Sequence, residues 1–227
     1  MRVAIYFTPD RDHPLTRHAA AWLGRDAFAA DDAATDTGDG RPVSEPARYG
    51  FHATLKAPFR LARPHTLAAL DVALSAFARS RAGLELGTLR LARIDGFFAL
   101  VPVCSPPELL ELEMEVRTYF EPYRAPLTEA DYIRRKPDRL TPRQRDNLAR
   151  WGYPHVAEDF RFHMTLTDRV PDAEAPAIAA ELQCILGPAL RDTVRLDALA
   201  LFVEPEPGQP FSIHSRQALG LPATIEA

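Results

Sequence analysis

One short pattern occurs twice in this chain of 227 residues and constrains its fold more than any other feature. The first copy is Phe-His-Ala-Thr-Leu at 51–55, and the second is Phe-His-Met-Thr-Leu at 162–166. Apolar and polar residues alternate in both copies, which is typical of a β-strand with one face in the core. We therefore predict two strands, one carrying His52 and Thr54 and the other His163 and Thr165 on their polar faces.

Cationic residues accompany both copies of the pattern. The predicted strands place Arg48 and Lys56 on the polar face of the first copy and Arg161 on the polar face of the second. Imidazole, hydroxyl and cationic groups on one face suit the binding of an anion. A further candidate is Tyr6, in an alternating N-terminal stretch at 3–8 that predicts another strand.

The residues that follow each copy indicate an internal duplication. Similar spacing in each half predicts a His strand, a helix and two further strands, which is the signature of a repeated unit. The expected elements are 48–58, 66–81, 84–93 and 97–103 in the first half, and 160–167, 173–186, a strand from 194 and 211–219 in the second. Residues 95–96, Asp-Gly, predict a hairpin turn, and 107–120 a helix that connects the two halves.

The predicted fold class is α+β, a pseudo-twofold duplicated fold of two lobes. Antiparallel sheets would line a central cleft, with helices on their outer faces. The length and a hydrophobic content of 46% suit one bilobal domain over 1–227. We expect a first lobe at about 1–104, a connecting helix and basic insert at 105–159, and the second His strand and repeat at 160–227. Residues 30–45, rich in Asp, Thr, Gly and Ala, are expected to form a mobile surface loop.

The charge and cysteine content narrow the possible partners. A formal net charge of −4 argues against charge-driven binding to nucleic acids or membranes in general. Two cysteines form neither a disulfide framework nor a zinc motif. We expect no metal and no cofactor. The N-terminal apolar run is too short for a signal peptide, and we expect a cytoplasmic protein.

The insert at 121–159 has no counterpart in the first half and concentrates positive charge. The residues predicted to approach the cleft and bind a second phosphate are Arg134, Arg135, Lys136 and Arg139. The alternative is that these cations form an ordinary solvated helix face.

Two histidines brought together across a pseudo-dyad make an acid/base pair. One imidazole can accept a proton while the other, as imidazolium, donates one. The hydroxyls of Thr54 and Thr165 can hold non-bridging phosphoryl oxygens, and nearby cations can neutralise the developing charge. This chemistry suits opening of a strained cyclic phosphate without a metal ion. A histidine metal site is the alternative, but a third ligand at fixed spacing is lacking.

The two His-x-Thr motifs, in two similar halves, resemble those of the 2H phosphoesterase superfamily. The longer stretches at 49–59 and 160–167 are similar to a bacterial branch often associated with phosphonate-utilisation operons. The superfamily resemblance implies cyclic phosphodiesterase or RNA-ligase-like activity on 2′,3′- or 1″,2″-cyclic phosphates or 2′-5′ linkages. The operon association implies a small phosphorylated substrate, such as a ribose cyclic phosphate.

Two other functions stay open. One is RNA 2′,3′-cyclic phosphodiesterase or 2′-5′ ligase-like activity, and the other is non-catalytic binding of a nucleotide or RNA end in the same cleft. The acidic composition weighs against broad RNA binding. The sequence leaves open which histidine is the base and which the acid, the product's regiochemistry, and the oligomeric state.

Overall fold

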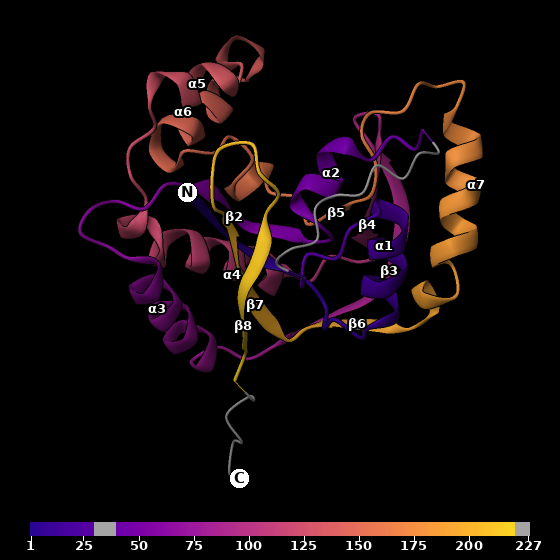
Figure 1. Cartoon of the computed structure of the whole chain (residues 1–227), viewed down its shortest axis with the longest axis horizontal. Coiled ribbons are helices and arrows are strands. Elements are labelled where there is room, and N and C mark those ends of the chain that lie inside the picture. Colours follow the sequence, from indigo (N-terminus) through magenta and orange to yellow (C-terminus); the bar gives the residue numbers. More distant parts are fainter. Residues whose placement is uncertain (30–39, 221–227) are drawn as a thin grey trace.

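The computed structural model describes residues 1–29 and 40–220, so most of the predicted loop at 30–45 lies outside the described residues. The strands are β1 (Arg2–Phe7), β2 (Ala53–Phe59), β3 (Leu84–Ile94), β4 (Phe97–Pro102), β5 (Met164–Thr165), β6 (Thr193–Leu196), β7 (Ala198–Glu204) and β8 (Ser212–Ala218). The α-helices are α1 (Pro14–Leu23), α2 (Ser44–Tyr49), α3 (Leu67–Arg79), α4 (Pro107–Tyr119), α5 (Glu129–Arg134), α6 (Pro142–Trp151) and α7 (Ala175–Leu186). The predicted α+β class is confirmed (Figure 1).

The eight strands form one antiparallel sheet in the order β6-β3-β4-β5-β2-β1-β7-β8. Only Asp197 separates β6 from β7 in the chain, although these strands lie near opposite ends of the sheet order. The sheet therefore has to curl, and Figure 1 shows this curvature.

The strands that carry the repeated pattern, β2 and β5, are neighbours at the centre of the sheet. Four strands, β5-β4-β3-β6, form one half of the sheet, and β2-β1-β7-β8 form the other. Strand β3 follows β2 in the sequence but lies in the half that contains β5. Likewise, β7 follows β5 in the sequence but lies in the half that contains β2. The lobes therefore exchange strands, and the boundaries near 104 and 160 stay a prediction about the sequence repeat.

The predicted hairpin between β3 and β4 is confirmed. Asp95 and Gly96 have φ values of 47° and 93°, and Ile94 pairs with Phe97 across the turn. Two consecutive residues with positive φ match the right-handed twist of the flanking strands, and Asp-Gly tolerates that conformation.

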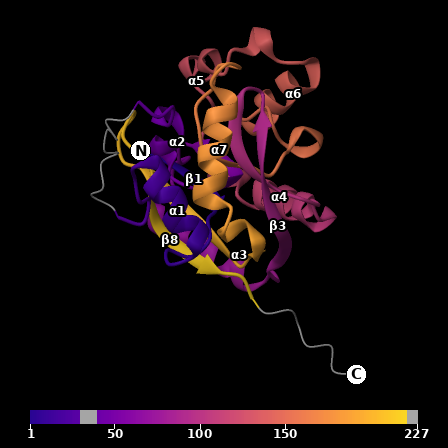
Figure 2. The same cartoon turned by 90° about the vertical axis from the view of Figure 1, so that its right-hand side faces the viewer.

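Helices cover the outer faces of both halves of the sheet. On one half α3 packs on β7 and β8, and α4 packs on β2; on the other, α7 packs on β3 and lies beside α1 (Figure 2). The helix predicted at 66–81 is α3, and its apolar stripe is buried, with Leu70 and Leu74 fully excluded from solvent and Phe77 2% exposed. Burial of side chains of this size contributes about 1.5–3 kcal/mol each.

The strand predicted to begin at residue 48 begins instead at Ala53, because the preceding residues form α2. The Asp168 carboxylate accepts hydrogen bonds from the backbone N–H and hydroxyl of Ser44 and from the N–H of Glu45, which caps the first turn. Gly50, with φ of 74°, ends the helix. The prediction that Arg48 lies on the same strand face as His52 is therefore wrong.

The second His strand is also shorter than predicted. Only Met164 and Thr165 are in β5, and the preceding residues 160–163 are irregular. The alternation of burial nevertheless runs through 162–166, with Phe162, Met164 and Leu166 buried. The pattern thus predicted which side chains enter the core, although most of its residues are outside regular strand structure.

Candidate active site

The two copies of the repeated pattern lie side by side in the antiparallel β2–β5 pair. Ala53 pairs with Met164 in the antiparallel register, and both side chains are fully buried in the core. Because side chains alternate along a strand, the residues on either side of this pair point to the opposite face of the sheet.

This register sets the four repeated polar residues in two crossed pairs. Continued by one residue in each direction, it places His52 opposite Thr165. It likewise places Thr54 opposite His163. All four side chains are partly buried. The two histidines are diagonal neighbours, for which about 7–8 Å is typical, a span that one phosphate can bridge.

The short strand β5 is held in place by contacts from two other elements. The indole of Trp22, in α1, donates a hydrogen bond to the Leu166 carbonyl at 2.7 Å. The Phe98 N–H, in β4, donates to the Thr167 hydroxyl at 2.8 Å. These buried contacts fix the backbone beside Thr165 although the strand itself is two residues long.

The two imidazoles are fixed in the same way. The Nδ1 of His52 lies 2.8 Å from the Gly50 carbonyl, and that of His163 lies 2.7 Å from the Arg161 carbonyl. A carbonyl only accepts hydrogen bonds, so each Nδ1 carries the proton and each neutral ring has its lone pair on Nε2. Within 1–29 and 40–220, neither Nε2 has a hydrogen-bond partner, so both are available for proton transfer.

Both histidines are held neutral near pH 7. Burial lowers the pKa of His52 from 6.5 to about 4, with the hydrogen bond to the Gly50 carbonyl opposing the shift and His163 adding to it. Burial also lowers the pKa of His163, and the neighbouring Arg161 charge acts in the same direction. Each ring therefore starts as a base unless a bound anion stabilises its imidazolium form.

Residues of β2 and of the insert that contains α5 and α6 line a cavity of about 450 Å³. The insert projects from the rest of the fold in Figure 1. Thr54 and His163 are in its wall, while His52 and Thr165 are not among the lining residues. Its aromatic lining residues are Phe59, Phe97, Trp151, Tyr153, His155 and Phe160. Nine Lys and Arg residues and five Asp and Glu residues line the cavity, so it favours an anionic ligand.

Two cations predicted beside the first histidine are engaged by carboxylates. The Lys56 ammonium is buried, 2.9 Å from Glu121 and 3.1 Å from the Arg117 carbonyl, and burial lowers its pKa. Arg48 forms an ion pair with Glu204. Binding of phosphate by these two residues stays a prediction, and it would compete with an existing ion pair.

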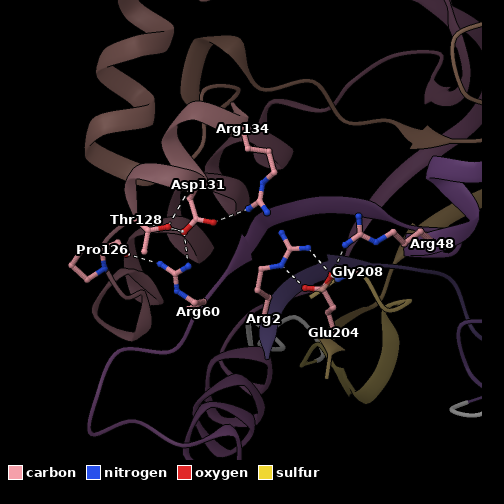
Figure 3. Close-up of polar contacts among 9 residues, drawn as sticks. All are labelled: Arg2, Arg48, Arg60, Pro126, Thr128, Asp131, Arg134, Glu204 and Gly208. Carbon is pink, nitrogen blue, oxygen red and sulfur yellow. Dashed lines mark hydrogen bonds and ion pairs between the residues drawn. The ribbon is translucent and has the colours of Figure 1, made fainter. Parts of the chain in front are cut away.

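Sequence reasoning missed Arg2, which shares the buried Glu204 with Arg48 and lines the cavity (Figure 3). The Gly208 N–H also donates to this carboxylate at 3.1 Å. The sequence contained a signal for Arg2, because strand alternation places it on the same face as Tyr6, which is a candidate site residue.

The insert brings two of its four predicted cations to the cavity. Arg134 and Arg135 line it, whereas Lys136 and Arg139 are not among its lining residues. Arg134 is 2.8 Å from Asp131, which also pairs with Arg60 (Figure 3).

Residues 54–212 match the family DUF1045, described as a protein of unknown function. The chain belongs to this family. The matched region begins at Thr54 and includes the second His-x-Thr motif, the connecting helix and the insert.

Two curated relatives of this DUF1045 chain are named ribose 1,5-bisphosphate phosphokinase PhnN. The protein of Janthinobacterium sp. (strain Marseille) is 37% identical over 222 residues, covering 92% of this chain and 49% of the relative. The protein of Laribacter hongkongensis (strain HLHK9) is 36% identical over 217 residues, covering 94% and 50%. The chain thus spans about half the length of these relatives.

Two solved structures are similar to this chain at low sequence identity, and the first of them shows the same fold. The protein TT0787 of Thermus thermophilus has a TM-score of 0.50 at 14% identity, covering 97% of this chain and 99% of that one. LigT of E. coli, complexed with ATP, has a TM-score of 0.48 at 14% identity, with 96% and 97% covered.

The described part of this DUF1045 chain contains neither a candidate membrane-spanning helix nor a candidate metal site. No helix there has the length and apolar character needed to cross a bilayer. No three His, Cys, Asp or Glu side chains in that part are grouped so as to hold a metal ion.

Proposed function

We propose that this DUF1045 chain is a metal-independent phosphodiesterase that opens a small cyclic phosphate, with His52 and His163 as its acid/base pair. The observation that carries the proposal is the crossed arrangement of two histidines and two threonines on neighbouring strands. Both imidazoles have Nδ1 bound to a backbone carbonyl, which leaves both Nε2 atoms for chemistry.

The proposed reaction is the hydrolysis of one of the two ring P–O bonds of the cyclic phosphate. The Nε2 of the neutral histidine takes a proton from water as the water oxygen attacks phosphorus. The bond from phosphorus to one ring oxygen breaks, and the second histidine, as imidazolium, donates its Nε2 proton to that oxygen. A phosphomonoester and a free hydroxyl result, and the two histidines have exchanged protonation states.

The hydroxyls of Thr54 and Thr165 are assigned to the two non-bridging phosphoryl oxygens. Neither hydroxyl has a hydrogen-bond partner among residues 1–29 and 40–220, so both can donate to a ligand. Arg161, adjacent to His163 in the cavity wall, is assigned to neutralise charge on the reacting phosphate.

The names of the relatives support a sugar phosphate as the substrate. Those proteins are named for a kinase activity on ribose 1,5-bisphosphate, and this chain aligns with about half of each. Opening a cyclic phosphate on ribose so that phosphate stays on C1 gives a ribose 1-phosphate. With phosphate also on C5, the product is the compound that the named kinase consumes.

A second candidate function is cyclic phosphodiesterase activity on an RNA end or a nucleotide. The aromatic side chains in the cavity wall, Phe97 and Tyr153 among them, favour it, because such rings stack on nucleobases. A module that binds these ligands without catalysis would use the same rings and no proton transfer.

The test is turnover of a substrate panel in the presence of a chelator, followed by phosphorus NMR. The panel contains ribose cyclic phosphates with and without a 5-phosphate, and nucleoside 2′,3′-cyclic phosphates. We expect wild-type protein to open a ribose cyclic phosphate and His163→Ala to do so about 10²–10⁴ times more slowly. Preference for the nucleoside substrates would favour the second function, and binding of all compounds without turnover would reject an enzyme.

A further inference from the structure

Most of the cations around the cavity are already paired with carboxylates. The paired ones are Arg2 with Glu204, Lys56 and Arg124 with Glu121, Arg60 and Arg134 with Asp131, Arg117 with Glu113, and Arg143 with Asp159. Within residues 1–29 and 40–220, the two cavity-lining cations without a carboxylate partner are Arg135 and Arg161. These two guanidinium groups are therefore the ones whose charge is free to meet a ligand.

Arg161 and Arg135 come from different parts of the cavity wall. Arg161 is two residues before His163 and its carbonyl orients that ring. Arg135 is the C-cap residue of helix α5 in the insert, where its guanidinium lies 5.0 Å from the centroid of the Tyr153 ring. The Tyr153 ring in turn meets His155 edge-on at 5.5 Å.

The packing of Arg135 on Tyr153 prepares it to bind an anion. The N–H donors of a guanidinium lie in its plane. When an aromatic ring packs against its face, these donors stay free to form two parallel hydrogen bonds to a phosphate. The side chain is partly buried, whereas its neighbours Arg134 and Lys136 are exposed. Less side-chain entropy is then lost when a ligand binds.

The charge of Arg135 also reaches the His52 side of the site. Burial raises the pKa of Tyr6 well above 10.0, with Tyr49 and Tyr153 adding to the shift, and Arg135 acts in the opposite direction. Tyr6 stacks on His52. Arg135 therefore lies within electrostatic range of the ring that supports one histidine, and it belongs to the same site.

We infer that Arg135, supported by Tyr153, binds a second phosphate of the substrate, at a distance from the cyclic phosphate held between the histidines. The substrate class is then a cyclic phosphate that carries a further phosphomonoester. This inference rests on the proposed function and adds a specificity-determining residue to it.

The matched control for Arg135 is Arg143. It is also a cavity-lining arginine of the insert, but its guanidinium makes two hydrogen bonds, of 2.8 and 2.9 Å, to Asp159. If positive charge in the cavity acts only in a general way, alanine at either position should have the same effect. If Arg135 is the phosphate ligand, the two effects should differ.

The experiment compares kcat and KM of wild type, Arg135→Ala, Arg135→Lys and Arg143→Ala on a ribose cyclic phosphate with and without a 5-phosphate. We expect Arg135→Ala to lose about 10- to 100-fold in kcat/KM on the 5-phosphorylated substrate, mainly through KM, since hydrogen bonds to charged groups are of that strength. The substrate without 5-phosphate should change less than about threefold, and Arg135→Lys should recover part of the loss. Equal losses on both substrates, or the same losses in Arg143→Ala, would overturn the inference.

A binding measurement separates failure of this inference from failure of the proposed function. Calorimetric titration with ribose 5-phosphate, which has no cyclic phosphate, tests the subsite without any turnover. Weaker binding by Arg135→Ala than by Arg143→Ala supports the subsite even if no cyclic phosphate is hydrolysed. Equal binding by all variants overturns the subsite, even if cyclic phosphates are hydrolysed.

Discussion

The ring of Tyr6 stacks on the ring of His52, with centroids 3.9 Å apart and 24° between the planes. Tyr6 is 1% exposed and belongs to a small core cluster with Phe202 and Phe211 on the site side of the sheet. Its direct contact is thus with a histidine. The predicted contact of Tyr6 with substrate stays a prediction, and the structure supports a positioning role.

Replacing Tyr6 by Leu should raise the pKa of His52 from about 4 toward 6.5, because the stack that excludes water from the imidazole is lost. The measurement is an NMR titration of the histidine ring protons. Tyr132→Leu, at an exposed position in α5, is the control and should leave His52 unchanged. An unaltered His52 titration in Tyr6→Leu would show that other groups bury the ring.

His52→Ala and His163→Ala should each lower kcat by about 10²–10⁴, the usual contribution of one positioned proton transfer. The double variant should be little worse than either single variant, because the pair acts as a unit. His214→Ala, which removes an exposed histidine of β8, is the control. Activity lost in chelator and restored by a divalent metal would instead make the two histidines metal ligands.

The pH dependence of kcat/KM should be bell-shaped, with both limbs of the profile below pH 6.5. One histidine must be neutral and the other charged, and burial lowers the pKa of His52 to about 4 and that of His163 below 6.5. The kcat/KM profile reports these values for the free enzyme. The limbs of kcat should lie at higher pH, because a bound phosphate favours the imidazolium form. A kcat/KM that stays constant through this range would refute the pair.

The buried His52 should also make the free energy of unfolding depend on pH. The pKa is 6.5 in the unfolded chain and about 4 in the fold, so between these values the unfolded state binds more protons. Stability should therefore fall as pH decreases through this window, by up to about 1.4 kcal/mol per unit from this group, and its contribution should level off below it. Urea denaturation of wild type and His52→Gln, compared across the window, isolates the effect. Parallel curves for the two proteins would exclude it.

Glu204→Gln should destabilise the fold by about 3–5 kcal/mol, because it leaves Arg2 and Arg48 without their fully buried carboxylate. The contrasting variant is Asp131→Asn. Its two arginine partners, Arg60 and Arg134, have side chains that are 37% and 55% exposed, so about 1 kcal/mol or less is expected. Urea denaturation measures both, and equal losses would contradict the difference in burial between the two ion-pair clusters, whose contacts Figure 3 draws.

The elements that were predicted correctly depend on local signals. The stripe of Leu70, Leu74 and Phe77 indicated α3, and Asp95-Gly96 indicated the β3–β4 turn. Burial in the two motifs also followed their alternation. These features need only neighbouring residues, and the described fold agrees with them.

The features that were missed depend on distant contacts. Helix α2 is capped by Asp168, which is 124 residues from Ser44, so alternation alone favoured a strand there. Lys56 lines the cavity, but its ammonium is already bound by Glu121. Carboxylates from other elements pair with most of the cavity cations and so determine which cations remain available to a ligand. The spacing of residues in the sequence does not contain that information.

The matching attachment of the two imidazoles has a consequence for how a catalytic cycle ends. Since each Nδ1 is bound to the carbonyl two residues earlier, neither ring is dedicated to giving or taking protons. The orientation of the bound substrate then assigns the roles. In the proposed mechanism, a turnover that leaves the two protonation states exchanged needs no relay through the protein, because protons can exchange with water before the next substrate molecule binds.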